Sequence, residues 1–391
     1  MHPPGGQVTY LDHAATTPLR PEVAQAMAEV RAEPLGNPTG SHPPAQRARQ
    51  LLEEARDEVA ALVGCQPGEV VFTSGGTESA NLAVFGSLAG AAAAGARPLL
   101  CHSAVEHPAV LESCRAAAHQ GADVRVIGVD GTGRVDLDDL AHALEAGPLL
   151  VAVMTANNET GVRQPLAEVV ALVRERCPGT GIFSDAVQAA PFLDLAQATA
   201  GADLVGLSAH KVGGPVGAGA LVVRAPWPLA AHQHGGGQER ERRSGTQDVT
   251  GAVGLATALR LAAAERAQVA QRVAALRDRL AEGLSAELND VQRTIPPGTE
   301  TLPGHLHLCL RGIEREELLV ALGRYGVCAS GGSSCASGAL EASHVLAAMG
   351  VSGDLARGAI RFTLGHDTNE DDIERALAVV PEVVRSLRRG V

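Results

Sequence analysis

Short apolar runs alternate with amphipathic stretches through the first two thirds of this 391-residue chain. The apolar runs are typical of buried strands, and they lie at residues 71–73, 99–102, 124–129, 149–154, 181–184, 204–208 and 220–223. Between them, apolar residues recur at helical spacing at residues 21–31, 45–63, 77–94, 108–120 and 166–176. Because strands that alternate with helices build a largely parallel sheet with helices on both faces, the pattern predicts an α/β fold.

The last third of the chain has a different pattern. An Ala-, Leu- and Arg-rich stretch over residues 251–284 predicts a long helix that leads into a second region. This region has a strand-like run at residues 306–310 and helical patterns at residues 315–325 and 371–387. Residues 291–303 are polar and rich in turn formers, and we expect them to form a surface loop.

A chain of this length is expected to fold as two domains, because a single small core does not accommodate it. We predict a large domain over residues 15–265, which contains the alternating pattern. Residues 1–14 and 266–391 are then expected to form a smaller α+β domain.

The formal net charge of -12 argues against a nucleic-acid or membrane-surface binder, which needs a basic face. No uninterrupted apolar run reaches the roughly 20 residues of a membrane span, and the N-terminus lacks a basic segment followed by an apolar one. Seven cysteines at irregular spacing fit reduced thiols better than a disulfide framework. These features predict a cytoplasmic protein.

Lys211 is the only lysine among the 32 Lys and Arg residues of the chain. A chain that uses arginine for nearly every cation is expected to keep a lysine where arginine cannot replace it. A primary amine condenses with an aldehyde to form a Schiff base, which a permanently protonated guanidinium does not do. Codon bias alone also explains a single surviving lysine, so the residues around Lys211 must decide between the two interpretations.

Polar residues follow five of the predicted strands. In open α/β sheets, ligands bind beyond the carboxyl ends of the strands, so these residues are expected to line one crevice. They are the run TSGGTES at 73–79, Glu106 and His107, the run NNETG at 157–161, Asp185 and Gln188, and finally Ser208, His210 and Lys211.

Three of these residues fit the ring of pyridoxal phosphate. An acid at a strand end, here Asp185, keeps the pyridine nitrogen protonated and so makes the ring an electron sink. Gln188, one turn further on, is placed to hydrogen-bond the ring phenolate, and His107 to stack on the ring face. Taken singly, an Asp or His at a strand end is more often a satisfied structural residue, and the combination with the lone lysine favours the cofactor.

The cofactor phosphate is expected at Gly76 and Thr77, where small residues open a helix whose free N–H groups and dipole favour an anion. Ser208 and His210 lie two strand positions apart, so we expect both to face this phosphate. Lys211 then reaches the aldehyde. A Gly-rich turn at a helix start is also a common structural device, and on its own it does not indicate a phosphate site.

Two competing motifs are weaker. The glycine-rich runs at 128–133 and 213–219 resemble dinucleotide loops, but neither follows a strand and opens a helix with a downstream acid, so turn glycines are favoured. His232 and His234 lack partners at ligand spacing, and a loop near the cofactor is favoured over a metal site.

The chain resembles the cysteine desulfurases of the class V aminotransferase family over nearly its whole length. The motifs that carry the resemblance are LDHAATTP at 11–18, NP at 37–38 with His42, FTSGGTES at 72–79, EH at 106–107, NNETG at 157–161, SAHK at 208–211, and GGGQER at 235–240 with RSGT at 243–246. One departure is the charged run ERERR at 239–243, which puts the preference for a sulfur acceptor in doubt.

The resemblance implies a type I pyridoxal-phosphate fold and a homodimer. In such a dimer Thr246 is expected to reach the phosphate of the neighbouring subunit's cofactor. Asn158 and Arg361 are expected to hold the substrate carboxylate, for which a planar guanidinium is well suited. Asn158 is also expected to contact the cofactor. A structural salt bridge is the alternative interpretation of Arg361.

Cys335 distinguishes among the many reactions that pyridoxal phosphate supports. It lies in ASGGSSCASG at 329–338, a run of small residues in which a buried structural cysteine is not expected. We therefore predict a reactive thiol that accepts sulfur from L-cysteine as a persulfide. Cys328 is the nearest rival, and a Cys328/Cys335 pair that binds a metal or forms a redox couple is an alternative.

The resemblance assigns a role to each group. Lys211 removes the α-proton of L-cysteine, Cys335 attacks the substrate sulfur, L-alanine leaves, and His107 acts as acid and base for the thiol steps. The cysteine loop resembles that of desulfurases that serve iron-sulfur cluster assembly and tRNA thiolation, so a sulfur-acceptor protein is the expected partner. We expect no resident metal, although Cys335 is a candidate for a transient iron-sulfur ligand. A selenocysteine lyase, another aminotransferase of the fold and a thiol-bearing scaffold without turnover are the alternatives.

Overall fold

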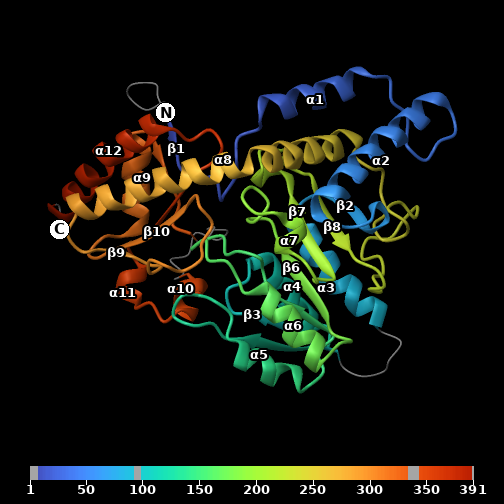
Figure 1. Ribbon diagram of the computed structural model, residues 1–391, viewed down its shortest axis with the longest axis horizontal. Coiled ribbons are helices and arrows are strands. Elements are labelled where there is room, and N and C mark those ends of the chain that lie inside the picture. The colour runs from blue at the N-terminus through green and yellow to red at the C-terminus, as the bar shows by residue number, and fades with distance from the viewer. Residues whose placement is uncertain (1–7, 92–97, 333–342, 390–391) are drawn as a thin grey trace.

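The computed structural model describes residues 8–91, 98–332 and 343–389. The two larger of three sheets organise this part of the chain, and one long helix spans both of them (Figure 1). A short parallel pair joins β1 (Thr9–Tyr10) near the N-terminus to β11 (Val327–Cys328). The N-terminal segment therefore lies beside elements of the last third of the sequence.

The larger sheet has the strand order β2-β8-β7-β6-β5-β3-β4. Its strands pair in parallel except β8, which runs antiparallel to both β2 and β7. The carboxyl ends of β3, β5, β6 and β7 consequently lie at the same edge of the sheet. The strands are β2 (Val70–Thr73), β3 (Leu99–Ser103), β4 (Asp123–Ile127), β5 (Leu150–Ala152), β6 (Gly181–Asp185), β7 (Leu204–Ser208) and β8 (Gly219–Val223).

Helices cover both faces of this sheet. Val70 and Phe72 of β2 join the core shared with α2, α5, α6 and α8, whereas Val71 between them faces the core shared with α3 and α4. Burial of both faces explains why these strands are continuous apolar runs rather than alternating ones. The helices before α8 are α1 (Pro21–Ala32), α2 (Pro43–Val63), α3 (Gly76–Ala91), α4 (Pro108–His119), α5 (Leu137–Leu144), α6 (Leu166–Arg176) and α7 (Leu195–Ala198), with 3₁₀ turns η1 (Pro67–Glu69) and η3 (Ala209–Lys211).

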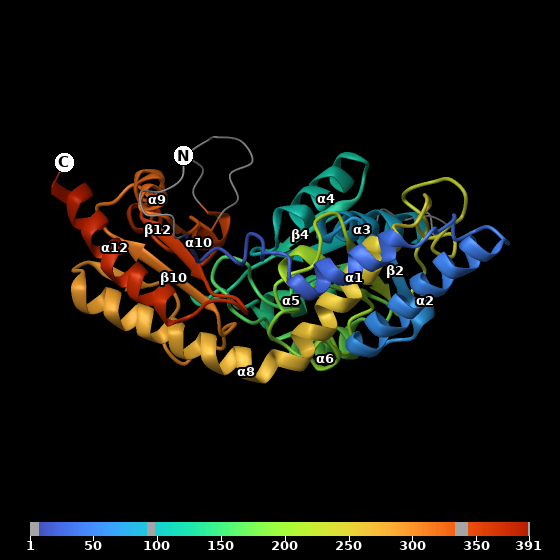
Figure 2. The same ribbon diagram turned by 90° about the horizontal axis from the view of Figure 1, so that it is seen from above.

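Helix α8 (Val249–Glu287) connects the two sheets, as Figure 2 shows from above. Asp248 caps its start by accepting a hydrogen bond from Gly251 N. The first half of the helix packs on the core of the large sheet through residues such as Leu255 and Leu259. The second half packs on the core of the small sheet through Leu276 and Leu280.

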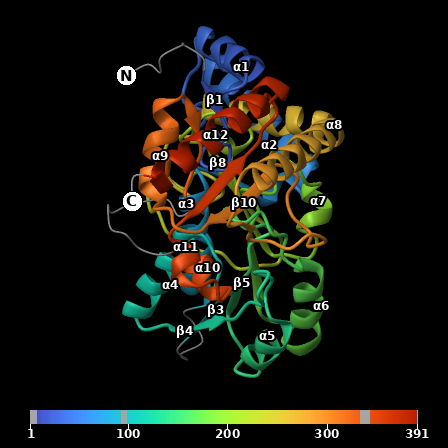
Figure 3. The same cartoon turned by 90° about the vertical axis from the view of Figure 1, so that its left-hand side faces the viewer.

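The small sheet is antiparallel, with the order β12-β10-β9. Leu306, Leu308 and Leu310 of β10 face the core that α8, α9 and α12 share, and these helices gather around β10 in Figure 3. His305, His307 and Cys309 alternate with these leucines and face the opposite side of the sheet. The elements are β9 (Val291–Arg293), β10 (His305–Leu310), α9 (Arg315–Arg324), α10 (His344–Ala348), α11 (Gly353–Ala356), β12 (Ala359–Thr363) and α12 (Glu370–Arg389).

The α/β fold class predicted from the sequence is confirmed, and each predicted strand and helix has a counterpart among the described elements. The prediction of a loop over residues 291–303 is wrong at its start, because β9 pairs there with β10. Helix α5 was not predicted. The domain division near residue 265 stays a prediction, and no helix in the described ranges is long and apolar enough to cross a membrane.

Candidate active site

Residues from the strand ends of the large sheet line one pocket of about 220 Å³, and Arg361 of β12 completes it. The pocket contains each predicted cofactor and substrate residue except Thr246 and Cys335. Cys335 lies outside the described residues. The lining residues are Ala14, Gly76, Thr77, His107, Met154, Ala156, Asn158, Asp185, Val187, Gln188, Ser208, His210, Lys211 and Arg361.

Lys211 lies in the 3₁₀ turn that directly follows β7. Its Nζ donates hydrogen bonds to the carbonyl oxygens of Ala14, at 2.6 Å, and Ala15, at 2.7 Å. Burial is the main reason that the pKa of Lys211 falls to about 8, with Arg361 contributing and Asp185 opposing. At neutral pH a larger fraction of this amine is therefore neutral than for an ordinary lysine.

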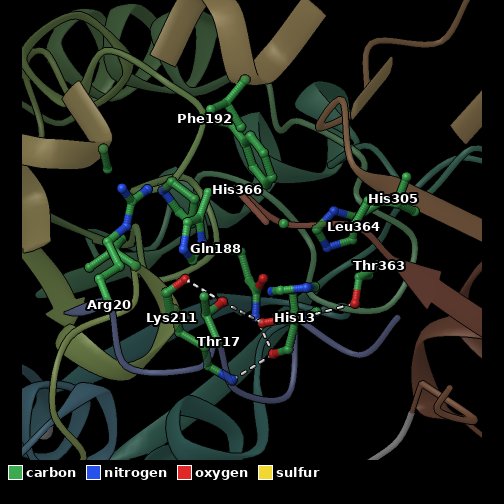
Figure 4. A pocket seen from close by; sticks show the side chains of 16 residues that line it. His13, Thr17, Arg20, Gln188, Phe192, Lys211, His305, Thr363, Leu364 and His366 are labelled. Carbon is green, nitrogen blue, oxygen red and sulfur yellow. Dashed lines mark hydrogen bonds between the residues drawn. The ribbon is translucent and has the colours of Figure 1, made fainter. Parts of the chain in front are cut away.

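Lys211 also lines a second cavity, which Figure 4 shows from close by. It shares Ala14, Gln188 and Lys211 with the pocket. Gln188 Nε2 donates to the carbonyl oxygen of Ala14 at 2.9 Å. The segment at residues 13–17 therefore holds both the lysine and the glutamine in place, a contribution that the sequence reasoning did not assign.

Asp185 ends β6, and its Oδ1 accepts a hydrogen bond from Val187 N at 3.0 Å. Burial raises the pKa of Asp185, and His107 and Lys211 oppose this shift. His107 caps α4, where its Nδ1 accepts from Ala109 N at 3.1 Å. Burial lowers the pKa of His107, so the ring is neutral and its Nε2 is left for other partners.

The predicted phosphate seat lies at the start of α3, where Gly76 and Thr77 line the pocket. A Cβ on Gly76 would meet Val187 Cγ2 at 3.0 Å, so the close approach of the chain favours glycine there. Ser208 ends β7, but His210 lies in the following 3₁₀ turn. Strand periodicity therefore does not place both residues on one face, and this part of the prediction is wrong, although both residues line the pocket.

Arg361 is 3% exposed. The sequence left open whether it holds the substrate carboxylate or forms a structural salt bridge, and its position is compatible with both. It lines the pocket, and it also forms an ion pair with Asp12, from Nη2 to Oδ1 at 2.7 Å. Its Nη1 donates to the carbonyl oxygens of Asn158, at 2.8 Å, and Gly332, at 3.4 Å. The pairing with Asp12, far away in the sequence, could not be predicted.

Thr246 does not line the pocket of its own chain. It follows the charged run at 239–243, which a buried ion pair anchors: Glu239 bonds Arg56 at 2.7 and 2.9 Å and also accepts from Phe72 N. Arg243 bonds Glu78 in the first turn of α3. These contacts hold the segment just before Thr246 against α2, β2 and α3.

Glu106 is a buried acid beside the pocket, and the sequence did not predict a role for it. Its Oε1 accepts from Ser103 Oγ at 2.6 Å and from Met154 N at 2.8 Å, and its Oε2 has no hydrogen-bond partner among the described residues. Burial raises the pKa of Glu106 to about 8. Glu106 is therefore largely protonated at neutral pH.

The chemistry of the pocket walls fits pyridoxal phosphate. An amine of lowered pKa, a buried carboxyl group and the first turn of a helix with free N–H groups face one cavity. These groups suit an aldehyde, a ring nitrogen and a phosphate respectively. No group of three or more His, Cys, Asp or Glu residues in the described ranges is arranged to hold a metal ion.

Comparisons with known proteins agree with this chemistry. A family model described as Aminotransferase class-V matches residues 9–376. The IscS-like cysteine desulfurase of Mycobacterium tuberculosis is 42% identical to the chain over 387 residues, which cover 98% of each protein. A solved structure described as a NifS-like protein has a TM-score of 0.90 and 32% identity, covering 97% of this chain and 100% of the other.

A further solved structure, described as SspA in complex with cysteine, has a TM-score of 0.78 and 29% identity, covering 91% of this chain and 98% of the other. Both the family model and the desulfurase relative span almost the whole chain, and the residues that the family model matches include those of the pocket. The chain therefore belongs to the class-V aminotransferase family, among its pyridoxal-phosphate-dependent cysteine desulfurases.

Proposed function

We propose that this enzyme takes the sulfur of L-cysteine, releases L-alanine and leaves a persulfide on Cys335. The C–S bond of the substrate breaks and an S–S bond to Cys335 forms, while the thiol proton ends on alanine, so no external oxidant or reductant is needed. The observation that carries the proposal is the meeting of Lys211, Asp185 and Arg361 in one pocket. A structure described as a cysteine complex of a similar protein supports the choice of substrate.

Lys211 is proposed to hold the cofactor and then to remove the α-proton of the substrate. Its pKa of about 8 leaves part of the amine neutral, as a base requires. The carbonyl oxygens of Ala14 and Ala15 orient the amine by accepting its hydrogen bonds. Pyridoxal phosphate, when bound, supplies the electron sink for the electrons that the lost proton leaves behind.

Asp185 is proposed to act on the cofactor ring, and His107 on the thiol of the substrate. The carboxyl group of Asp185 is held by Val187 N and would pair with the ring nitrogen. His107 has a neutral ring whose Nδ1 accepts from Ala109 N, so its Nε2 carries the ring proton and would donate a hydrogen bond to the sulfur of the substrate. Both residues line the pocket.

The described residues on either side of the Cys335 segment support its assignment. Gly332 lies beside Arg361, whose Nη1 donates to its carbonyl oxygen at 3.4 Å. Ser343 donates from Oγ to Glu159 at 2.6 Å, and Glu159 belongs to the same turn as Asn158. Cys335 follows Gly332 by three residues, a span of about 10 Å in a fully extended chain. Chain length therefore allows its sulfur to reach a substrate held at Arg361.

The proposed function predicts that L-cysteine yields L-alanine and sulfide in equal amounts when a thiol reductant releases the persulfide. An aminotransferase of this fold would give a keto acid instead, and a scaffold without turnover would give neither product. Amino-acid analysis and sulfide determination on one reaction mixture measure the ratio. Formation of a keto acid in place of alanine contradicts the proposal.

We further propose that the enzyme is a homodimer in which Thr246 contacts the phosphate in the neighbouring subunit. Supporting this, Thr246 does not line the pocket of its own chain, and its segment is anchored to β2 through Glu239 and to α3 through Arg243. The expected setting is the cytoplasm, which suits the free thiols of the six described cysteines. Sulfur acceptors in iron-sulfur cluster assembly or tRNA thiolation are the proposed partners.

Mixing two variants that are impaired in different residues of the site tests the dimer. Thr246→Val is expected to weaken cofactor binding by about ten-fold or more, because a hydrogen bond to a charged group contributes about 1.5–3 kcal/mol. Refolded mixtures of Thr246→Val with Lys211→Ala subunits are expected to regain activity at limiting cofactor, since one site per mixed dimer keeps both residues. Turnover in the mixture no higher than the sum of the parents would show that Thr246 acts within its own subunit.

A further inference from the structure

Arg361 lines the pocket, and its guanidinium group is already paired with an acidic residue of the protein. The ion pair joins its Nη2 to Asp12 Oδ1 at 2.7 Å, and the Asp12 side chain is 20% exposed. Its Nη1 is occupied by two carbonyl oxygens, those of Asn158 and Gly332. Arg361 Nε is buried and has no hydrogen-bond partner within the described ranges. A substrate carboxylate that binds this guanidinium must therefore approach it beside Asp12.

Asp12 is held at this position by the fold. It pairs with Thr363 of β12 in an isolated parallel bridge, two residues from Arg361 in the same strand. On its other side the chain continues to Ala14 and Ala15, whose carbonyl oxygens bind Lys211. Asp12 consequently has little freedom to withdraw when a ligand arrives.

A second carboxylate at Arg361 has two opposing interactions. It gains a guanidinium partner, and it meets the negative charge of Asp12 a few ångströms away. The Asp12–Arg361 pair is formally neutral, so the pocket attracts a carboxylate less strongly than a free arginine would. Because the carboxylate is the same in L-cysteine and in L-alanine, this weakening acts equally on substrate and product.

We propose that Asp12 is a positioning residue that holds Arg361 in the pocket and limits its affinity for the amino-acid carboxylate, so that L-alanine leaves readily. The proposal rests on the proposed function, because it takes an α-amino acid as the ligand of Arg361. Asp12 does not touch the reacting atoms. Its charge sets how tightly substrate and product bind and leaves the chemical step unchanged.

Asp12→Asn tests the proposal because the amide keeps an oxygen that accepts from Arg361 Nη2 and loses only the charge. The KM for L-cysteine and the inhibition constant of L-alanine are both expected to fall roughly five-fold, with kcat within about two-fold of the wild type. L-Alaninamide has no carboxylate, so its inhibition constant is expected to stay unchanged. A purely structural role for Asp12 would instead raise all three constants by loosening the pocket.

Asp203→Asn is the matched control. Asp203 forms an ion pair of the same length with Arg174, at 2.7 Å, and is similarly exposed at 22%, but it does not line the pocket. Its substitution is expected to leave the KM and the inhibition constants unchanged. Asp12→Ser provides a second variant without the charge should the asparagine variant fold poorly, and cofactor absorbance shows that each variant is loaded.

Titration of cofactor absorbance with L-alanine measures ligand binding without turnover, and so separates this inference from the proposed function. If the wild type releases no sulfide from L-cysteine, the proposed function fails, whatever Asp12 does. If the wild type is active but Asp12→Asn binds L-alanine as weakly as the wild type or more weakly, the role given to Asp12 is wrong.

Discussion

Replacing Lys211 by alanine is expected to lower L-cysteine turnover by about 10³-fold or more and to remove the visible absorbance band of the bound cofactor. The chain has no other lysine, so no second ε-amine can take over the role. Lys211 Nζ is also the group that the carbonyl oxygens of Ala14 and Ala15 orient towards the pocket. Absorbance spectroscopy and alanine release, measured on the same preparation, check both effects.

Lys211→Arg separates amine chemistry from charge. Arginine keeps a cation near Ala14 and Ala15 but does not condense with an aldehyde, so this variant is expected to be as inactive as the alanine variant. In the wild type without cofactor, the rate of reconstitution is expected to rise as the pH approaches about 8 and to level off above it. Protonated amine predominates below the lowered pKa of Lys211 and neutral amine above it. An active arginine variant would contradict the role assigned to Lys211.

The location of the pocket could be predicted because parallel strands bring their carboxyl ends to one edge of a sheet. Asp185 and Ser208 each end a strand, and Lys211 follows within three residues, so the periodicity of the apolar runs was enough to bring them together. Both strands are buried on two faces, which gives them a strong apolar signal. The cofactor site therefore followed from local pattern and one topological rule.

Contacts between distant segments could not be predicted in this way. The pairs Arg56–Glu239 and Asp12–Arg361 join residues far apart in the sequence, and no local pattern relates them. Strand β9 is short and partly polar, and it exists because β10 offers a free edge. Propensity alone gives such a segment a loop character, since the partner strand and not its own sequence determines the pairing.

The sequence of helix α5 contains a capping residue that predicts where the helix begins. Asp136 caps it by accepting from the backbone N–H groups of Asp138 and Asp139, and Leu140 and Leu144 then recur at helical spacing. The eight-residue length kept this pattern below the length at which helical periodicity is distinctive. For a helix this short, the capping residue is a better predictor than the spacing of apolar residues.

Replacing Cys335 by serine is expected to lower alanine formation from L-cysteine by about 10³-fold or more while the cofactor stays bound. Serine has nearly the same shape, but its oxygen does not attack sulfur to form a persulfide. The residues that would hold cofactor and substrate carboxylate, Lys211, Asp185 and Arg361, are unchanged. Addition of L-cysteine is therefore still expected to perturb the absorbance of the bound cofactor, although no sulfide follows.

Cys328→Ser is the control for this result, because Cys328 is the nearest described thiol in the sequence. It is half-buried in β11, and burial raises its pKa, so at neutral pH it is largely a thiol and a poor nucleophile. Its substitution is expected to leave turnover close to that of the wild type. Alkylation and peptide mass spectrometry after one turnover should locate the additional sulfur atom on the peptide that contains Cys335. Wild-type turnover in Cys335→Ser, or the sulfur atom found on Cys328, would show that the sulfur follows another route.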